Sequence, residues 1–365
     1  MTRAPELRLS PAMQAVLDRL AADAEHSFGC ADVSIEPQAC DWRESSEVTR
    51  ARVTSSAGVH HVFAKVLKPR RAGIGIGETR ASLRHDYEVT RHVFAAMKGT
   101  TDLRAVEPVA WYEDLLGVVT HAAPGLPLDV LITRGARWPV TSASLAGLET
   151  GLARVGRWVA LFQQVAPDAA PSRMSLDAAR EYLDVRLRRL MLLPHAEFHE
   201  DDRCGILAYF DRRAADVSDD DLIDVPVHGD ITPSNIVMAP DRVTVLDFAM
   251  TGRGSKYLDI ARLYTQLDFY TAKPQYRPSV INRLQLAALS GFDARLQPDH
   301  PLFEICTLQH VVCHFLSHAR QPGRFLRSLY SRHQCRLHRR WLRDRSRSTG
   351  TPARAAVSVA ARQPR

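Results

Sequence analysis

The stretch 225–263, VPVHGDITPSNIVMAPDRVTVLDFAMTGRGSKYLDIARL, contains the most informative pattern of this chain. Two short apolar runs, Ile236–Met238 and Val243–Leu246, flank a turn at 239–242 that contains Pro and Asp. Apolar runs separated by such a turn predict a β-hairpin.

Oxygen-bearing side chains stand at both ends of this hairpin. Asn235 precedes the first strand and Asp247 follows the second. Because antiparallel pairing brings these two ends together, the carboxamide and the carboxylate should meet at one point. Mg²⁺ takes few protein oxygens and keeps the rest of its shell for water and phosphate. Asp230 lies just before the first strand, within reach of the same point. The hairpin therefore predicts a site for magnesium and phosphate.

The spacing of these residues carries a family resemblance. The pattern H-G-D-x-x-x-x-N followed by D-F is formed by His228, Gly229, Asp230, Asn235, Asp247 and Phe248. It resembles the protein-kinase-like phosphotransferases, specifically the aminoglycoside phosphotransferase and choline kinase branch, in which Gly replaces the Arg of the protein-kinase H-R-D. Ala249 departs from the Gly of the protein-kinase D-F-G. The alternative is that these Asp residues only form turns and caps.

The resemblance implies a role for each matching residue. Asp230 would orient the acceptor hydroxyl and take its proton, and Asn235 and Asp247 would hold Mg²⁺ on the phosphates of ATP or GTP. His228 and Asp259 would support the catalytic loop, with Asp259 accepting backbone N–H groups.

Lys65 lies inside the apolar strand 62–67, where an ammonium group is costly to bury unless it finds partners. It resembles the third-strand Lys of V-A-I-K, which pairs with the nucleotide phosphates and with a Glu on the following helix. Glu88 is the preferred partner, while Glu78 and Asp86 remain possible. The alternative is a Lys that faces outward from a half-buried strand.

The remaining patterns of the first third of the chain predict an antiparallel sheet with helices. Periodicity predicts strands at 33–37, 47–53, 60–66, 106–114 and 117–121, and helices at 11–24 and 78–97. The loop 40–46 lies where kinases cover the phosphates, so Ser45 and Ser46 are candidate phosphate contacts, or else part of an ordinary hairpin loop. The G-x-G-x-G at 73–77 indicates a flexible connector.

The segment 121–128, HAAPGLPL, resembles the hinge of the same family. Backbone groups near His121 and Ala123 would bind the edge of the base there. His121 stands where Glu is common, and because backbone groups do the binding, the choice between ATP and GTP stays open. Pro124 and Pro127 stiffen the exit from the hinge.

The second half of the chain is predicted to be mostly helical, with helices at 145–165, 176–193, 304–318 and 324–347. The acidic segment 197–224 is either a solvated face or a surface toward a cationic acceptor. Five residues share one face of the third helix: Cys306, His310, Cys313, His314 and His318. They are packed core, a metal face, or part of an acceptor pocket.

Composition narrows the class of protein. Among 365 residues the net charge is +7, but thirteen Arg and one acid after residue 319 give +12, so the rest carries −5. The basic end predicts a docked helix with outward Arg, or else an arm that binds nucleic acid or an anionic membrane surface. No apolar run approaches eighteen residues and the six Cys form no C-x-x-C pair, which predicts a cytoplasmic protein without a transmembrane segment. For the basic end we prefer the docked helix, so we do not expect nucleic acid as a partner.

These observations predict an α+β, protein-kinase-like, two-lobed fold. The expected division is an N-terminal helical extension (1–30), a nucleotide-binding N-lobe (31–120), a C-lobe for catalysis and acceptor binding (121–347) and a disordered tail (348–365). Only eleven residues separate Asp247 from Asp259, too few for a long activation loop, so we expect a small hydroxyl-bearing acceptor. The acidic body of the chain favours a cationic acceptor such as an aminoglycoside or another amine, and a sugar is the alternative. A catalytically inactive nucleotide-binding relative remains the alternative.

Overall fold

The computed structural model describes residues 8–43, 45–68, 75–166, 172–320 and 325–347. The chain divides into two compact units. Unit 1 comprises Met1–Ala170, Pro226–Arg253 and Gln275–Ala294, and unit 2 comprises Pro171–Val225, Gly254–Pro274 and Arg295–Arg365. The expected boundary between residues 120 and 121 lies inside unit 1, so the division into lobes stays a prediction. The expected tail at 348–365 lies outside the described residues.

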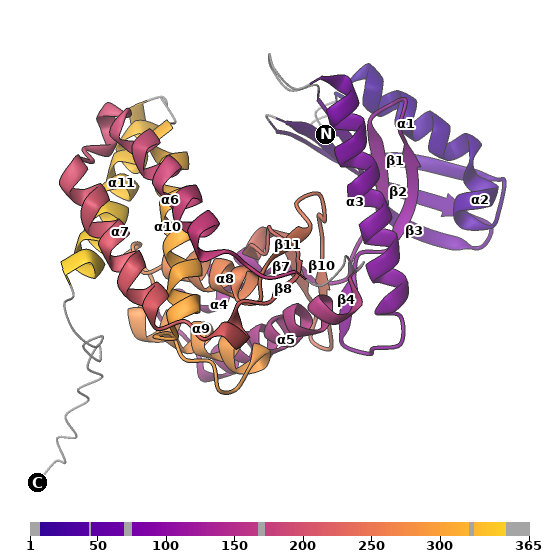
Figure 1. Cartoon of the computed structure of the whole chain (residues 1–365). Helices are drawn as coiled ribbons and strands as arrows, with labels where there is room; N and C mark the ends of the chain where they lie inside the picture. Colours follow the sequence, from indigo (N-terminus) through magenta and orange to yellow (C-terminus); the bar gives the residue numbers. More distant parts are fainter. Residues whose placement is uncertain (1–7, 44, 69–74, 167–171, 321–324, 348–365) are drawn as a thin grey trace, which may run out of the picture. The chain divides into compact units, whose positions relative to one another are not determined.

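The first sheet of unit 1 is five-stranded and antiparallel, in the order β1-β2-β3-β6-β5 (Figure 1). Its strands are β1 (Val33–Trp42), β2 (Ser46–Ser55), β3 (Gly58–Leu67), β5 (Pro108–Tyr112) and β6 (Gly117–His121). Side chains alternate between the two faces of such strands. Val62, Ala64 and Val66 of β3 are buried in one core, so Lys65 belongs to the other face. The predicted sheet is confirmed.

The helix α1 (Pro11–Ala22) packs on that apolar face and is followed by the short α2 (Ala24–Phe28). The Oγ of Ser10 accepts a hydrogen bond from the backbone N–H of Met13 and so caps the first turn. The buried side of α1 consists of Met13, Val16, Leu17 and Leu20, which share a core with the sheet. The helix predicted as an extension therefore completes the core of the sheet.

A second sheet of unit 1 has the order β4-β10-β9-β7. Its strands are β4 (Leu103–Ala105), β7 (Leu126–Pro127), β9 (Ile236–Met238) and β10 (Val243–Val245). The strands β9 and β10 pair antiparallel, so the predicted hairpin is confirmed. The parallel pairing of β4 with β10 was not predicted, because three residues are too few to show an alternating pattern.

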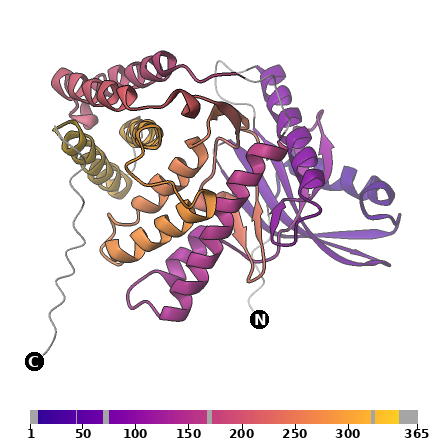
Figure 2. The ribbon, with the colours of Figure 1, turned by 60° about the horizontal axis from the view of Figure 1, so that its bottom comes forward.

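Helices make up the rest of unit 1: α3 (Ile76–Ala96), α4 (Leu128–Gly135), α5 (Ser142–Val165), α9 (Pro278–Phe292) and the 3₁₀ turn η3 (Pro233–Asn235). Two glycines let α5 and α9 approach closely. A Cβ on Gly156 would lie 2.1 Å from the carbonyl oxygen of Ala288, and one on Gly291 would lie 2.0 Å from that of Ala153. Figure 2 shows these two helices side by side.

Unit 2 is built mainly from helices (Figure 2). They are α6 (Leu176–Met191), α7 (Glu200–Ala215), α8 (Leu258–Asp268), α10 (Pro301–Arg320) and α11 (Phe325–Arg347), with the 3₁₀ turns η1 (Pro194–Ala196) and η2 (Asp219–Asp221). One apolar core joins α6, α7, α10 and α11. Two short strands, β8 (Asp224–Val227) and β11 (Gly252–Ser255), pair in a two-stranded sheet.

The helix α7 was missed because its sequence begins with a run of acids. Glu200, Asp201 and Asp202 occupy its first turn, where carboxylates are favoured by the positive end of the helix dipole. Asp202 accepts a hydrogen bond of 3.2 Å from the backbone N–H of His199 and another of 2.8 Å from Nη2 of Arg343. Further along the segment, Asp221 pairs with Lys256 at 2.7 Å. Several of these acids thus act as caps and ion-pair partners.

Three histidines of unit 2 are held neutral by their surroundings. Burial lowers the pKa of His310 to about 3, of His314 to about 4 and of His338 to about 3. His310 donates from Nε2 to the carbonyl oxygen of Leu258 at 2.8 Å.

Within the described ranges, none of the helices has both the length and the apolar character needed to cross a lipid bilayer.

Candidate active site

Lys65 and Asp247 meet in unit 1 although 182 residues separate them. The Nζ of Lys65 lies 3.1 Å from Oδ1 of Asp247 and 3.9 Å from Oδ2 of Asp86. The Lys65 side chain is only 24% exposed, so its ammonium is largely withdrawn from water and is compensated by two carboxylates. The expected outward-facing alternative for Lys65 is wrong.

The acid of α3 that lies against Lys65 is Asp86, one of the alternatives left open, and not the preferred Glu88. The two residues are two positions apart on one helix, so they point to different sides. Asp86 belongs to the buried stripe of α3, with Leu83, Thr90 and Val93 at helical spacing. A carboxylate within an apolar stripe is the sequence signal that would have identified it.

Asp86 also holds the backbone that follows Asp247. Its Oδ1 accepts a hydrogen bond of 2.9 Å from the backbone N–H of Phe248. Burial raises the pKa of Asp86 to about 6, and the nearby ammonium of Lys65 opposes part of that shift. One carboxylate therefore links Lys65 on β3 to the residue after Asp247.

The loop before the hairpin is fixed by His228, which is fully buried. Its Nε2 donates to the carbonyl oxygen of Leu246 at 3.1 Å, and its Nδ1 accepts from the backbone N–H of Asp230 at 3.2 Å. These two partners require the tautomer with the proton on Nε2. The rings of Trp158, Phe162 and Phe248 surround the imidazole, an enclosure that the sequence did not reveal.

Asn235 is tied to Asp230 at the end of the hairpin. Its Nδ2 donates to Oδ2 of Asp230 at 2.8 Å and to the carbonyl oxygen of Asp230 at 3.0 Å. The backbone N–H of Leu246 donates to the carbonyl oxygen of Asn235 at 2.9 Å, which brings Asp247 next to this turn. Because Nδ2 is used, Asn235 can offer its Oδ1 to a cation. That oxygen and the carboxylate of Asp247 are the hard ligands that Mg²⁺ prefers.

Two residues of this site have positive φ. Gly229 has φ +77°, and a Cβ there would lie 2.3 Å from the carbonyl oxygen of Met250. Asp247 has φ +66°, a left-handed conformation that Asp tolerates better than most residues. Such conformations persist where the surroundings impose them, and they cluster at functional sites.

The remaining predicted site residues lie in separate parts of the structure. Ser45 is exposed and its carbonyl oxygen accepts from the N–H of Lys68, whereas Ser46 is buried at the start of β2. His121 ends β6, with its ring 5.5 Å from that of His60, and Ala123 follows in the loop before β7. Asp259 is buried in the first turn of α8, in unit 2. The roles of these residues stay predictions.

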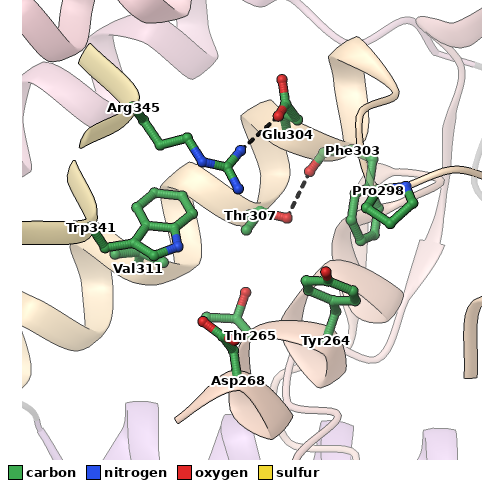
Figure 3. A pocket seen from close by; sticks show the side chains of 10 residues that line it. All are labelled: Tyr264, Thr265, Asp268, Pro298, Phe303, Glu304, Thr307, Val311, Trp341 and Arg345. Carbon is green, nitrogen blue, oxygen red and sulfur yellow. Dashed lines mark hydrogen bonds and ion pairs between the residues drawn. The ribbon is translucent and has the colours of Figure 1, made fainter. Parts of the chain in front are cut away.

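Unit 2 contains a pocket between the side chains of three helices. Figure 3 shows its lining, which consists of Tyr264, Thr265, Asp268, Pro298, Phe303, Glu304, Thr307, Val311, Trp341 and Arg345. Arg345 binds Glu304 at 2.6 Å and lies over the ring of Trp341, with 4.7 Å from its Cζ to the ring centroid. The lining therefore combines two carboxylates, one guanidinium, hydroxyls and aromatic rings.

A family model described as the phosphotransferase enzyme family matches residues 70–297, more than half of the chain. The chain belongs to this phosphotransferase family. The match covers Asp86 of α3, the loop at His228 and the hairpin that ends at Asp247, and Lys65 lies just before it. No curated protein matched the sequence.

Solved structures share the fold at low sequence identity. A thermostable mutant of the aminoglycoside phosphotransferase APH(4)-Ia, in complex with ADP and hygromycin B, is 14% identical with a TM-score of 0.54, covering 91% of this chain and 99% of that chain. A choline kinase from Cryptosporidium parvum is 9% identical with a TM-score of 0.55, covering 91% and 94%. A choline/ethanolamine kinase family protein from Mesorhizobium loti is 14% identical with a TM-score of 0.54, covering 92% and 96%. The predicted protein-kinase-like α+β fold is confirmed.

Proposed function

We propose that this protein transfers the γ-phosphoryl group of ATP or GTP to a hydroxyl of a small molecule. The observation that carries the proposal is the placement of Lys65 between Asp247 and Asp86. Asn235 and Asp230 lie at the same open end of the hairpin as Asp247. A cation and several oxygens at one point suit a triphosphate with its metal ion. Membership of the phosphotransferase family supports the same reaction class.

In this proposal each group positions or neutralises charge, since phosphoryl transfer leaves little covalent work to the protein. Asp230 accepts the proton of the acceptor hydroxyl and orients its oxygen toward the phosphorus. Lys65 binds phosphate oxygens. Asn235 and Asp247 hold Mg²⁺, which neutralises phosphate charge when it is bound. Asp86 keeps Lys65 in place through its own charge.

The acceptor that we propose is small and bears an amine or a sugar. Structural neighbours include an aminoglycoside phosphotransferase solved with hygromycin B and a choline kinase. The described chain supports a small acceptor, because the span between Asp247 and Asp259 is short and β11 (Gly252–Ser255) already takes up part of it.

The test is acceptor-dependent release of ADP or GDP in a screen of hydroxyl-bearing amines, sugars and antibiotics. Once an acceptor is found, Asp230→Asn is expected to lower kcat by about 10²- to 10⁴-fold, the usual contribution of a positioned general base. The matched control is Asp241→Asn, an exposed turn residue of the same hairpin. Wild-type turnover in Asp230→Asn would refute Asp230 as the base.

A catalytically inactive nucleotide-binding protein is the competing function. Thermal unfolding with Mg·ATP or Mg·GTP separates the two, since a bound ligand stabilises the folded state. We expect a rise in Tm for the wild type and a much smaller rise for Asp247→Asn, which keeps the tolerated φ but removes the charge. A rise in Tm without turnover on any acceptor of the screen would favour the inactive protein.

A further inference from the structure

Unit 2 brings three histidines together from two helices. His314 and His318 are four residues apart on α10, and His338 comes from α11. One ring nitrogen of each lies within 4.8 Å of one ring nitrogen of the other two. Among the described residues, this is the group of three His, Cys, Asp or Glu side chains that meets this distance. The sequence showed the pair on α10 but could not bring His338 to it.

The hydrogen bonds of these rings leave nitrogens unused. Nδ1 of His314 and Nε2 of His338 are buried without a hydrogen-bond partner in the described part of the chain. His338 is only 3% exposed. A buried polar atom without a partner destabilises a fold by about 1–3 kcal/mol. Two such atoms in one cluster leave ring nitrogens available to a ligand.

The other nitrogen of His314 has a partner that suits metal binding. Nε2 of His314 is hydrogen-bonded to the side-chain amide of Gln266 on α8. The O and N atoms of an amide are interchangeable by a flip, so Oε1 of Gln266 can accept the Nε2–H proton of His314. Metal-ligating histidines typically donate their second ring N–H to such an oxygen, which fixes the ring and leaves the opposite nitrogen for the metal.

The surroundings of the cluster are aromatic. The ring of Phe269 lies 4.4 Å from that of His314 and 5.0 Å from that of His338. The ring of Phe315 lies 6.0 Å from that of His338, and His318 stacks on His338 at 5.7 Å. Apolar walls limit access of water, and a bound cation would interact strongly with its ligands there.

We propose that His314, His318 and His338 bind one divalent transition-metal ion, foremost Zn²⁺, through three neutral imidazoles. Zn–N bonds of 2.0–2.1 Å in tetrahedral geometry place ligand nitrogens about 3.4 Å apart. Small rotations of the three rings close the difference from the observed spacing. The fourth position is left to water or another small ligand.

The site is distinct from the proposed magnesium site. Imidazole nitrogens select zinc, cobalt, nickel or copper, whereas Mg²⁺ takes the oxygens of Asn235 and Asp247 in unit 1. The ion would join α11 to α10 inside one core, so its expected effect is to stabilise unit 2. Its loss should leave the chemistry of unit 1 intact.

The test uses full-length protein without a polyhistidine tag, stripped with a chelator and then titrated with Zn²⁺ by calorimetry. We expect one ion per chain, a rise in Tm on binding, and the visible absorption of tetrahedral cobalt with Co²⁺ instead of Zn²⁺. His318→Ala is the first variant, because its side chain is only partly buried and the fold should tolerate the change. It should weaken binding at least about tenfold. His333→Ala on the exposed side of α11 is the matched control and should bind as the wild type does.

A second variant tests the geometry rather than the presence of histidine. Gln266→Ala removes the partner of His314 without removing a ligand, and it should weaken Zn²⁺ binding by about 10- to 100-fold. Failure of wild-type protein to bind Zn²⁺ or Co²⁺ at micromolar concentrations would overturn the proposal. So would equal binding by wild type and His318→Ala, because the ion would then sit elsewhere.

Discussion

At the scale of single residues, Gly229 shows why the H-G-D sequence needs glycine. Its φ of +77° is open to glycine at little cost, and a Cβ would press on the carbonyl oxygen of Met250. Gly229→Ala is expected to lower the free energy of unfolding by about 1–3 kcal/mol. Denaturant unfolding measures this, with Gly252→Ala as the control, since a Cβ there meets nothing within 4 Å and its φ is not positive. Equal losses in both variants would contradict the explanation.

Asp86 gives a pH dependence whose sign follows from its pKa. The pKa is about 6 in the folded state, above the usual 3.8 of an aspartate, so the folded state holds the proton to higher pH. The contribution of Asp86 to stability is therefore present below pH 3.8 and is lost as pH rises through 6. Asp86→Asn keeps an acceptor for the N–H of Phe248 and should remove this loss, about 3 kcal/mol at most. Denaturant unfolding of both proteins at pH 4.5 and 7 tests it. If the free energy of unfolding changed with pH to the same extent in the wild type and in Asp86→Asn, the pH dependence would not come from Asp86.

The sequence predicted the oxygen ligands at the ends of the hairpin strands more securely than the partner of Lys65. Asn235 and Asp247 follow from strand alternation and one turn, which are local and depend on no distant contact. The choice between Asp86 and Glu88 depends on the rotation of α3 about its axis. That rotation is set by the packing of the buried stripe of α3. It can be predicted from the sequence only if Asp86 is counted as a member of that stripe.

At the scale of elements, α1 behaves as a structural part of the first sheet. Leu20 is fully buried in the core that contains Val62, Ala64 and Val119. Leu20→Ala should lower the free energy of unfolding by about 2–5 kcal/mol, because it removes buried methyl groups and leaves a cavity. Gln14→Ala, on the exposed side of the same helix, should change it by less than about 0.5 kcal/mol. A loss below about 1 kcal/mol for Leu20→Ala would show that α1 is dispensable.

Elements with a clear period were predicted, and those without one were missed. The strands β2 and β3 and the helices α5 and α10 each have long apolar repeats. The three-residue β4 forms because it pairs with the edge of β10. That partner lies in a distant part of the chain, so the local sequence of β4 does not predict the strand. The acids at the start of α7 indicated a charged surface. Their ion-pair partners, such as Arg343 for Asp202, lie far along the sequence, so the local sequence did not show that these acids are paired.

At the scale of the whole molecule, the basic C-terminal end is less free to bind anions than its composition suggests. Three arginines of α11 form ion pairs within unit 2: Arg339 with Glu197, Arg343 with Asp202 and Arg345 with Glu304. The acidic segment 197–224 and the basic helix α11, which lie far apart in the sequence, thus neutralise part of each other's charge. This favours the docked-helix interpretation of α11 over an arm for nucleic acid or lipid.

Asp86 and His310, one in each unit, are expected to respond to acid in opposite directions. Burial lowers the pKa of His310 in unit 2 to about 3 from its usual value of 6.5, so only the unfolded state takes up a proton between these values. Its contribution is therefore present above pH 6.5 and is lost as pH falls toward 3, by at most about 1.4 kcal/mol per pH unit. Asp86 in unit 1 acts in the opposite sense between pH 3.8 and 6.

His310→Gln tests the contribution of His310 alone to the acid sensitivity of unit 2. Gln can place its amide nitrogen where Nε2 of His310 donates to the carbonyl oxygen of Leu258, but it cannot be protonated. The variant should be less stable than the wild type at pH 7.5, because the buried ring is lost, and the difference should shrink as pH falls to 4.5. Chemical unfolding at several pH values measures both curves. A difference that stays constant across this range would mean that His310 takes up its proton equally in both states, and that its burial does not govern the response to acid.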